Sequence, residues 1–224
     1  MKVKQYTLIG VILFLTSNIQ AQNVKKVTTP KVKNVLGFTP TKVNKINGLA
    51  LGISFKNSLS SVAAHKRDLV INGLNLGINP LGFYSWPFAE EFHPYEHDIE
   101  YYDKVLAGAS KSRVNGMSVS IFHASATKIQ GLNIAASVTS VDEINGVSIS
   151  GLNNLAYKLR GVSIAIVKNK VVKAHGIQIG LYNKATDLRG FQFGLWNVNG
   201  RRSLPFINWQ FSSKKKRRKK KAKK

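Results

Sequence analysis

Glycines recur along this chain at a nearly constant interval. Eight segments share the pattern apolar–x–Gly–apolar–x–apolar, and their marking glycines are Gly48, Gly73, Gly116, Gly131, Gly146, Gly161, Gly176 and Gly190. The last six are spaced 15, 15, 15, 15 and 14 residues apart, and the first gaps of 25 and 43 fit the same unit with insertions. A fixed period on this scale indicates stacked structural repeats.

Each repeat has the pattern of a β-strand. The residues one and three positions after every marking glycine are apolar, and the residue between them is Ala, Asn, Ser or Gln. Alternation with period two predicts a strand with one apolar face, which we expect to be the buried one. The residue two positions before the glycine is apolar as well, so the apolar phase slips at the glycine. Such a slip predicts a β-bulge or a sharp bend there.

Two further positions of the repeat are selective. The fourth residue after the glycine is never larger than serine: Gly52, Gly77, Ser120, Ala135, Ser150, Ala165, Gly180 and Gly194. This predicts a close approach to the backbone, either at a second bend or loop or along a strip on which a partner or second sheet packs. Asn153, Asn183 and Asn197 share a later position and predict an asparagine ladder, which Lys168 would interrupt.

Two all-β architectures fit the repeat. In a parallel β-solenoid each coil has about 15 residues, and like residues stack on like residues. In an antiparallel β-barrel of outer-membrane type, odd and even repeats would face different surroundings and should differ in sequence, which they do not. The sequence therefore favours the solenoid. The last segment, residues 204–211, places Ile207, Trp209 and Phe211 on one face, and a final strand ending in Phe is also typical of outer-membrane barrels.

The two ends of the chain differ in composition from the repeats. Residues 1–21 have the pattern of a secretory signal peptide: Lys2 and Lys4 precede a short apolar run, and Ala21 suits the cleavage position. We expect a linker over residues 22–45, a repeat domain over 46–211 with an insertion at 80–112, and a disordered tail over 212–224. The chain has no cysteine, which excludes disulfides and thiolate metal sites.

The tail carries much of the formal charge of +24, since residues 214–224 hold ten positive charges in eleven residues. Like charges at this density repel one another and predict disorder. We expect the tail to bind anionic envelope surfaces such as lipopolysaccharide, lipid head groups or acidic polysaccharide, unless it only keeps the chain soluble. The residues expected to bind are Lys214, Lys215, Lys216, Arg217, Arg218, Lys219, Lys220 and Lys221. The tail lacks aromatic residues, so we expect no sequence-specific nucleic-acid binding.

The last repeats resemble a known family. Residues 177–183 (IQIGLYN), residues 191–197 (FQFGLWN) and the closing LPFINWQF are similar to exported surface-repeat proteins of spirochaetes and Bacteroidetes. The resemblance covers about residues 46–211, and the polybasic tail departs from it. It implies an exported protein of unassigned function and supplies no catalytic residues.

The insertion holds the one motif with possible chemistry. His93, Glu96 and His97 match the H-x-x-E-H pattern of one class of zinc peptidases, but Pro94 lies between the histidines. They are weak candidates for a metal site, and no phosphate-binding or dinucleotide-binding motif indicates a cofactor. The sequence therefore predicts a non-catalytic structural or adhesive module at the bacterial cell envelope, in the periplasm, on the outer membrane or outside the cell. The alternatives are a small outer-membrane barrel that serves as pore or anchor and, more remotely, a metal-dependent hydrolase.

Overall fold

The structure, a computed structural model, describes residues 31–39, 41–53, 68–79 and 111–211, which belong to one compact unit that begins at Lys31. The predicted signal peptide, nearly all of the insertion and the polybasic tail lie outside the described residues. The strands are β1 (Val32–Thr39), β2 (Lys45–Ile53), β3 (Leu69–Ile78), β4 (Ser112–Ile121), β5 (His123–Ala135), β6 (Val138–Ser150), β7 (Asn153–Ala165), β8 (Lys168–Ile179), β9 (Tyr182–Asn199) and β10 (Ser203–Gln210).

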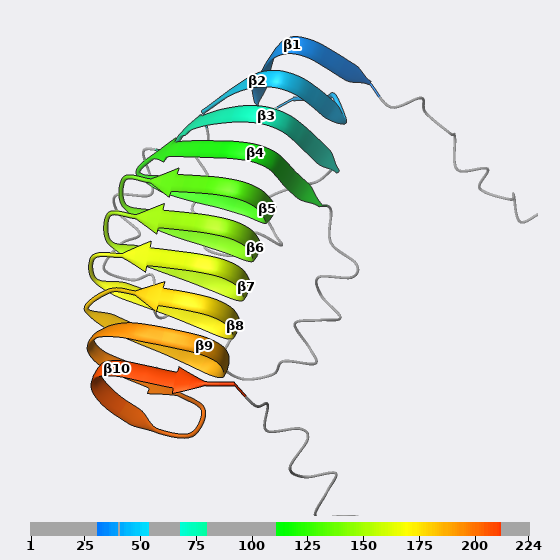
Figure 1. Ribbon diagram of the computed structural model, residues 1–224. Coiled ribbons are helices and arrows are strands. Elements are labelled where there is room, and N and C mark those ends of the chain that lie inside the picture. Colours follow the sequence, from blue (N-terminus) through cyan, green and yellow to red (C-terminus); the bar gives the residue numbers. More distant parts are fainter. Residues whose placement is uncertain (1–30, 40, 54–67, 80–110, 212–224) are drawn as a thin grey trace, which may run out of the picture. The chain divides into compact units, whose positions relative to one another are not determined.

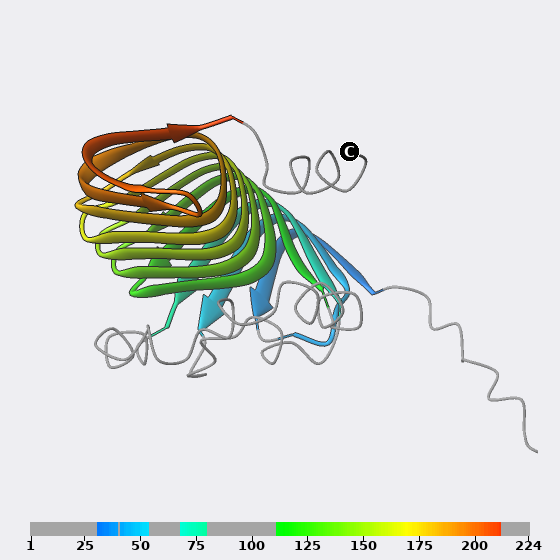
Figure 2. The same cartoon turned by 90° about the horizontal axis from the view of Figure 1, so that it is seen from below.

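The ten strands form a single sheet in sequence order, from β1 to β10 (Figure 1). Strands β1 to β9 pair in parallel with their neighbours, and like positions lie opposite one another, as Gly131 opposite Gly146 and Gly146 opposite Gly161. Along the stack, β5 to β9 each run around a coil (Figure 2). The predicted parallel β-solenoid is confirmed, and the antiparallel barrel is wrong because successive repeats run in the same direction.

The marking glycines form the corner of each coil. All eight have positive φ, from 108° at Gly48 to 143° at Gly190, in a region that side chains disfavour. A Cβ at Gly161 would collide with the carbonyl oxygen of Gly146 in the coil before it. The bend that the sequence predicts at the glycine is therefore confirmed, and the close stacking on a preceding corner explains why glycine stands at all eight of these positions.

The stack begins earlier than the sequence predicts. Strand β1 pairs in parallel with β2 over its whole length, so residues 32–39 belong to the repeat domain and not to the predicted linker. Val35 lies opposite Gly48 and adopts φ 79°. Because valine replaces the marking glycine, the pattern that reveals the other repeats is absent from this one. At the other boundary β4 begins at Ser112, so the insertion ends before that residue.

The alternating apolar residues point outward, and the expectation that they are buried is wrong. Asn133, two positions after its glycine, is 0 % exposed, whereas its neighbours Leu132 and Ile134 are partly exposed. The inward phase continues through the bend, so residues two before and two after the glycine both face the interior. The alternation of apolar residues shifts by one position at the glycine, because apolar residues lie on the inner side of the strand before the glycine and on its outer side after the glycine.

The interior has an apolar half and a polar half. The apolar half combines residues two and five positions before the glycine: Ile46, Ile71, Val114, Ala126, Ile129, Val141, Ile144, Ala156, Leu159, Val171, Ala174, Ala185 and Leu188. The polar half holds residues two and four positions after the glycine, such as Gln178 and Gln192, which are both 0 % exposed. Gln192 Nε2 donates to Gln178 Oε1 (2.8 Å), as buried polar groups require.

An asparagine ladder crosses the polar half, in a different register from the predicted one. Asn169 Nδ2 donates to Asn183 Oδ1 and Asn183 Nδ2 donates to Asn197 Oδ1, both at 2.8 Å. Asn154 lies opposite Asn169, so the ladder position passes from Asn154 to Asn169 and Lys168 does not interrupt it. The earlier turns are one residue longer than the later ones, and equal offsets from the glycine therefore fall on different positions.

The small residues at the fourth position face this ladder inside the coil. Ser150 Oγ donates to Asn154 Oδ1 (2.8 Å), and a Cβ at Gly194 would collide with the carbonyl oxygen of Gly180 in the preceding coil and lie 2.7 Å from Asn183 Nδ2. The predicted close approach to the backbone is confirmed, and in the later coils the position lies at or directly before a second bend, at residues 136–137, 151–152, 166–167 and 180–181. The alternative, a strip for a partner or second sheet, is wrong because these residues face the interior of the coil. They leave room for the asparagines of the facing part of the coil.

Candidate binding surfaces

One side of the solenoid is a broad apolar surface, which we call the apolar face. It comprises the residues one, three and five positions after the glycine (Val35 in β1), together with Ile207, Trp209 and Phe211 at the end of the chain. The first row is Leu36, Leu49, Leu74, Met117, Leu132, Val147, Val162, Ile177 and Phe191; the second is Phe38, Leu51, Leu76, Val119, Ile134, Ile149, Ile164, Ile179 and Phe193; the third is Ile53, Ile78, Ile121, Ala136, Gly151, Ile166, Leu181 and Leu195. Apart from the indole N–H of Trp209, no side chain on this face carries a polar atom.

The apolar face is exposed from the first coil to the last. Relative exposure is 66 % for Phe38, 37 % for Ile149, 40 % for Ile179 and 38 % for Phe191. With strands about 4.8 Å apart, ten strands extend the face over about 43 Å, and its rows span about 13 Å. Soluble monomers rarely leave so continuous an apolar surface uncovered, and such surfaces mark sites of interaction.

Aromatic side chains gather where the apolar face ends at β9 and β10. Trp209 pairs with Phe191 across the antiparallel ladder, and Phe211 meets Phe191 edge-on with ring centroids 5.2 Å apart. The guanidinium of Arg202 lies 4.5 Å from the centroid of Trp209 and donates to its backbone carbonyl (2.8 Å). Trp196, six positions after Gly190, is 48 % exposed. Phe211 is the last described residue, and the polybasic segment begins three positions later at Lys214.

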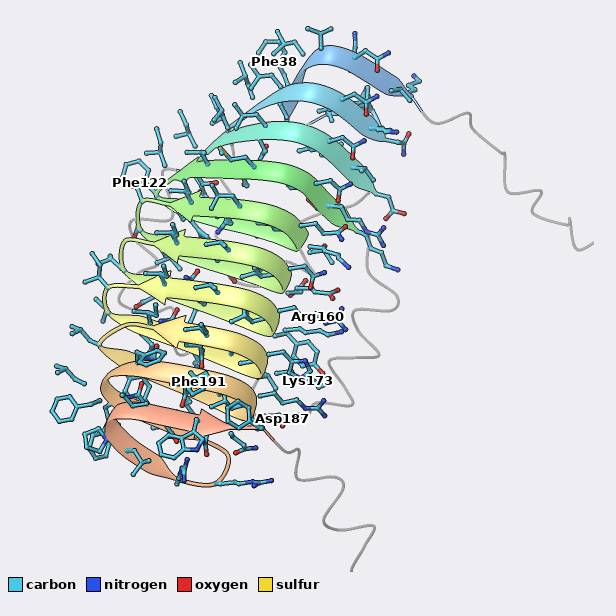
Figure 3. The ribbon with its side chains drawn as sticks, viewed as in Figure 1. Phe38, Phe122, Arg160, Lys173, Asp187 and Phe191 are labelled. Carbon is cyan, nitrogen blue, oxygen red and sulfur yellow. The ribbon has the colours of Figure 1, made fainter. Side chains whose placement is uncertain are left out.

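The edge before the marking glycines is polar and charged. Figure 3 shows Arg160, Lys173 and Asp187 along this edge of the stack, with Phe122 at the opposite edge. The carboxylate of Glu143 forms ion pairs with Lys128 and Lys158, whose Nζ atoms lie 3.3 Å and 3.6 Å from its oxygens. Partial burial raises the pKa of Glu143, but these lysines, with Arg160, outweigh burial and hold its pKa below the usual value.

Basic side chains concentrate on the later coils. Burial lowers the pKa of Lys168, and the charges of Lys170 and Lys184 lower it further. Lys173 Nζ donates to Tyr157 Oη (2.7 Å) and lies 4.7 Å from the centre of its ring. The charged edge and the apolar face therefore give the solenoid two chemically distinct sides.

Earlier coils carry an amide ladder on the same edge. Asn47 Nδ2 donates to Asn34 Oδ1 (2.8 Å), Asn72 Nδ2 to Asn47 Oδ1 (2.9 Å) and Asn115 Nδ2 to Asn72 Oδ1 (2.8 Å). These residues immediately precede the marking glycine, or Val35 in β1, so the stacking of corners brings the amides into register.

The predicted site residues divide into two groups. The eight marking glycines lie together at the corners and are structural. His93, Glu96, His97 and the tail residues lie outside the described residues, so the metal and tail predictions stay predictions. Within the described ranges no three His, Asp or Glu side chains are placed to hold a metal ion. The same ranges include no helix that is long and apolar enough to cross a membrane.

No family model, curated protein or solved structure matches the chain. The resemblance to exported surface-repeat proteins stays a prediction from the residues quoted above. The apolar face is the surface that the sequence pattern did not predict, since its residues were expected in the core.

Proposed function

We propose that this chain is a non-catalytic, exported repeat module that attaches to anionic surfaces of the bacterial cell envelope. The solenoid serves as a rigid body, and the tail of residues 214–224 supplies the electrostatic attachment. The observation that carries the proposal is the charge of the tail, ten positive charges in eleven residues. Such clusters bind anionic lipid and polyanion surfaces at about 1 kcal/mol per basic residue near the surface.

Two features of the fold support attachment by the tail. The described coils add basic residues of their own on one edge, including Lys158, Arg160 and Lys173. The last strand, β10, ends at Gln210, so the tail follows directly from the closed end of the stack. A rigid body with one charged extension is suited to adhesion, in which position and orientation matter more than chemistry.

Binding to anionic vesicles and to heparin tests the attachment. Processed protein (residues 22–224) should bind both at 50 mM salt, and removal of residues 214–224 should weaken binding at least about tenfold because the charge that attracts the surface is lost. A control in which residues 214–224 are replaced by a Gly/Ser segment of equal length separates charge from chain length. Equal binding by the shortened and complete chains would contradict the proposal.

Export is tested in the cell. Fractionation followed by protease treatment of intact cells should find a processed chain beginning at Gln22 in the envelope or outside the cell. Recovery of the uncleaved chain with Met1 in the cytoplasm would contradict export without bearing on vesicle binding.

A further inference from the structure

We propose that the apolar face lies on a lipid bilayer, with its side chains among the acyl chains and the polybasic tail on anionic head groups. This inference deepens the proposed function, on which it rests, because it names the anionic surface as a phospholipid membrane. The solenoid would lie with its apolar face in the interface.

The chemistry of the face is suited to hydrocarbon. The three rows contain only Leu, Ile, Val, Met, Phe, Ala and Gly, and the largest exposures include 53 % at Ile53, 67 % at Ile166 and 60 % at Leu195. Backbone N–H and C=O groups of these strands bond to neighbouring coils within the sheet. The outer surface therefore presents side chains alone, and contact with acyl chains leaves no backbone group of these paired strands without a partner.

Aromatic and basic residues follow one another closely in the chain where the apolar face ends. Trp209 stands at the aromatic end of the face, and amphipathic rings of this kind favour the boundary between acyl chains and head groups. Arg202 lies over Trp209, and Lys214 follows Phe211 by three residues. An apolar surface joined to a polybasic segment supplies two membrane signals, and stable anchoring of a peripheral protein takes two.

Charge favours a bilayer over a second copy of the chain as the occupant. Residues 22–224 carry +22, since Lys2 and Lys4 account for two of the +24 of the whole chain. Two copies packed face to face would bring two such charges together, whereas an anionic bilayer attracts them. A dimer through this face is therefore an outcome that the test must detect.

The test places positive charge on the face without reducing attraction to anionic lipid. In the double variant Ile149→Lys/Ile179→Lys both changed side chains are exposed, so the fold should be retained, which circular dichroism checks. Attachment by charge alone predicts equal or tighter binding to vesicles of phosphatidylglycerol and phosphatidylcholine. Contact through the apolar face predicts binding at least about tenfold weaker at 0.5 M salt, where surface charge is screened.

A matched variant adds the same charge elsewhere. Gln130→Lys/Thr186→Lys changes two exposed residues that precede the marking glycine and lie outside the apolar face. This variant should bind vesicles at 0.5 M salt as the unchanged protein does. Weakening of both variants to the same extent would contradict a specific role for the apolar face.

A second measurement does not depend on the lysine variants. With Trp86→Phe, the remaining tryptophans are Trp196 and Trp209, and acyl-brominated lipids should quench the emission of Trp209, which lies on the apolar face. Trp209→Phe in that background should remove part of the quenched signal. No quenching while the protein is bound to vesicles would overturn the inference and leave attachment by the tail intact.

Sedimentation equilibrium tests whether a second copy of the chain covers the apolar face. The processed protein should be monomeric without lipid at micromolar concentration. A dimer that Ile149→Lys/Ile179→Lys dissociates would assign the face to a second copy and overturn the membrane contact. Loss of vesicle binding at 50 mM salt on removal of residues 214–224 bears on the tail alone, so failure of either proposal can be told from failure of the other.

Discussion

Glycine at the corner allows successive coils to stack at strand spacing. At Gly161 the backbone has φ 130°, and the position of a missing Cβ is occupied by the carbonyl oxygen of Gly146. The neighbour is backbone and belongs to the sheet ladder, so it cannot move aside without breaking the register. The corner therefore requires glycine for both conformation and space.

Substitution of a marking glycine should lower the free energy of unfolding. We expect Gly161→Ala to lower the free energy of unfolding by at least about 3 kcal/mol, because strain in φ and a backbone collision add. Gly77→Ala is the matched control: its φ is ordinary, and the added Cβ would meet only Ser120 Oγ, at 3.3 Å. Urea denaturation of both variants measures the difference, and equal costs would contradict the assignment of the corner.

His123 predicts a pH dependence of stability. Burial lowers its pKa from 6.5 to about 4, so the folded protein holds the neutral imidazole. The unfolded chain binds the proton below pH 6.5 and the folded chain only near pH 4, so stability falls as pH falls through this window. The loss attributable to His123 is roughly 3 kcal/mol.

Denaturation of the unchanged protein and His123→Gln between pH 7 and pH 4 measures this loss. The variant should lack that part of the decline. In the control His175→Asn the decline should largely persist, because His175 lies on the partly exposed charged edge. Parallel pH profiles for the unchanged protein and His123→Gln would show that His123 is protonated in the fold.

At the scale of the element, the asparagine ladder joins one coil to the next through the polar half of the interior. Asn183 accepts from Asn169 and donates to Asn197 Oδ1 and to the carbonyl of Phe193 (2.8 Å each). Strands β8 and β9 thus have a side-chain ladder beside their backbone ladder. Buried amides of this kind specify register, since a shift by one residue would leave them without partners.

Removing one step of the ladder should destabilise the later coils. We expect Asn183→Ala to cost about 2–4 kcal/mol, because Asn197 Oδ1 loses its donor and Asn169 Nδ2, which keeps the carbonyl of Ile179, loses one of its two acceptors. Asn72→Ala removes an equivalent step from the partly exposed amide ladder at the corner and should cost less than about 1 kcal/mol. Thermal denaturation compares the two, and a similar loss in both would argue that burial does not set the cost.

At the scale of the whole molecule, the two ends of the stack are built differently. The last coil is closed by antiparallel β10, whose Asn208 is 0 % exposed and donates to the carbonyl of Asn197 (3.1 Å). The first strand, β1, keeps only Gly37 buried and holds Val35 at φ 79°. In a linear stack each coil is stabilised by its neighbours, so the strained first strand is the weakest described element.

Hydrogen exchange should be graded along the stack. Amides of β1 should exchange fastest among the described strands and those of β5 to β8 slowest. Val35→Gly should slow exchange in β1 by about tenfold, since a β-branched residue at positive φ is strained by about 1–3 kcal/mol. Faster exchange in the variant would mean that contacts of the Val35 side chain outweigh its strain.

Local rules predicted much of this architecture. The spacing of the glycines and the alternation of apolar residues predicted strands, bends, parallel stacking and a face shared by Ile207, Trp209 and Phe211. Strand β1 escaped prediction because Val35 stands where the glycine is expected. The asparagine ladder was predicted in the wrong register because turn length differs between coils, and turn length is not visible in the spacing after a single glycine.

By itself the sequence determined that each repeat is an extended segment with a glycine corner, because backbone conformation and period-two alternation are local properties. Only the tertiary structure decided which side of the strand is inside. Leu132 and Asn133 alternate identically whether the apolar or the polar side faces the core. Closure of a narrow coil settles the choice, since the inward Asn, Ser and Gln residues obtain hydrogen-bond partners only from the facing part of the coil and from its neighbours, and this leaves the apolar rows outside.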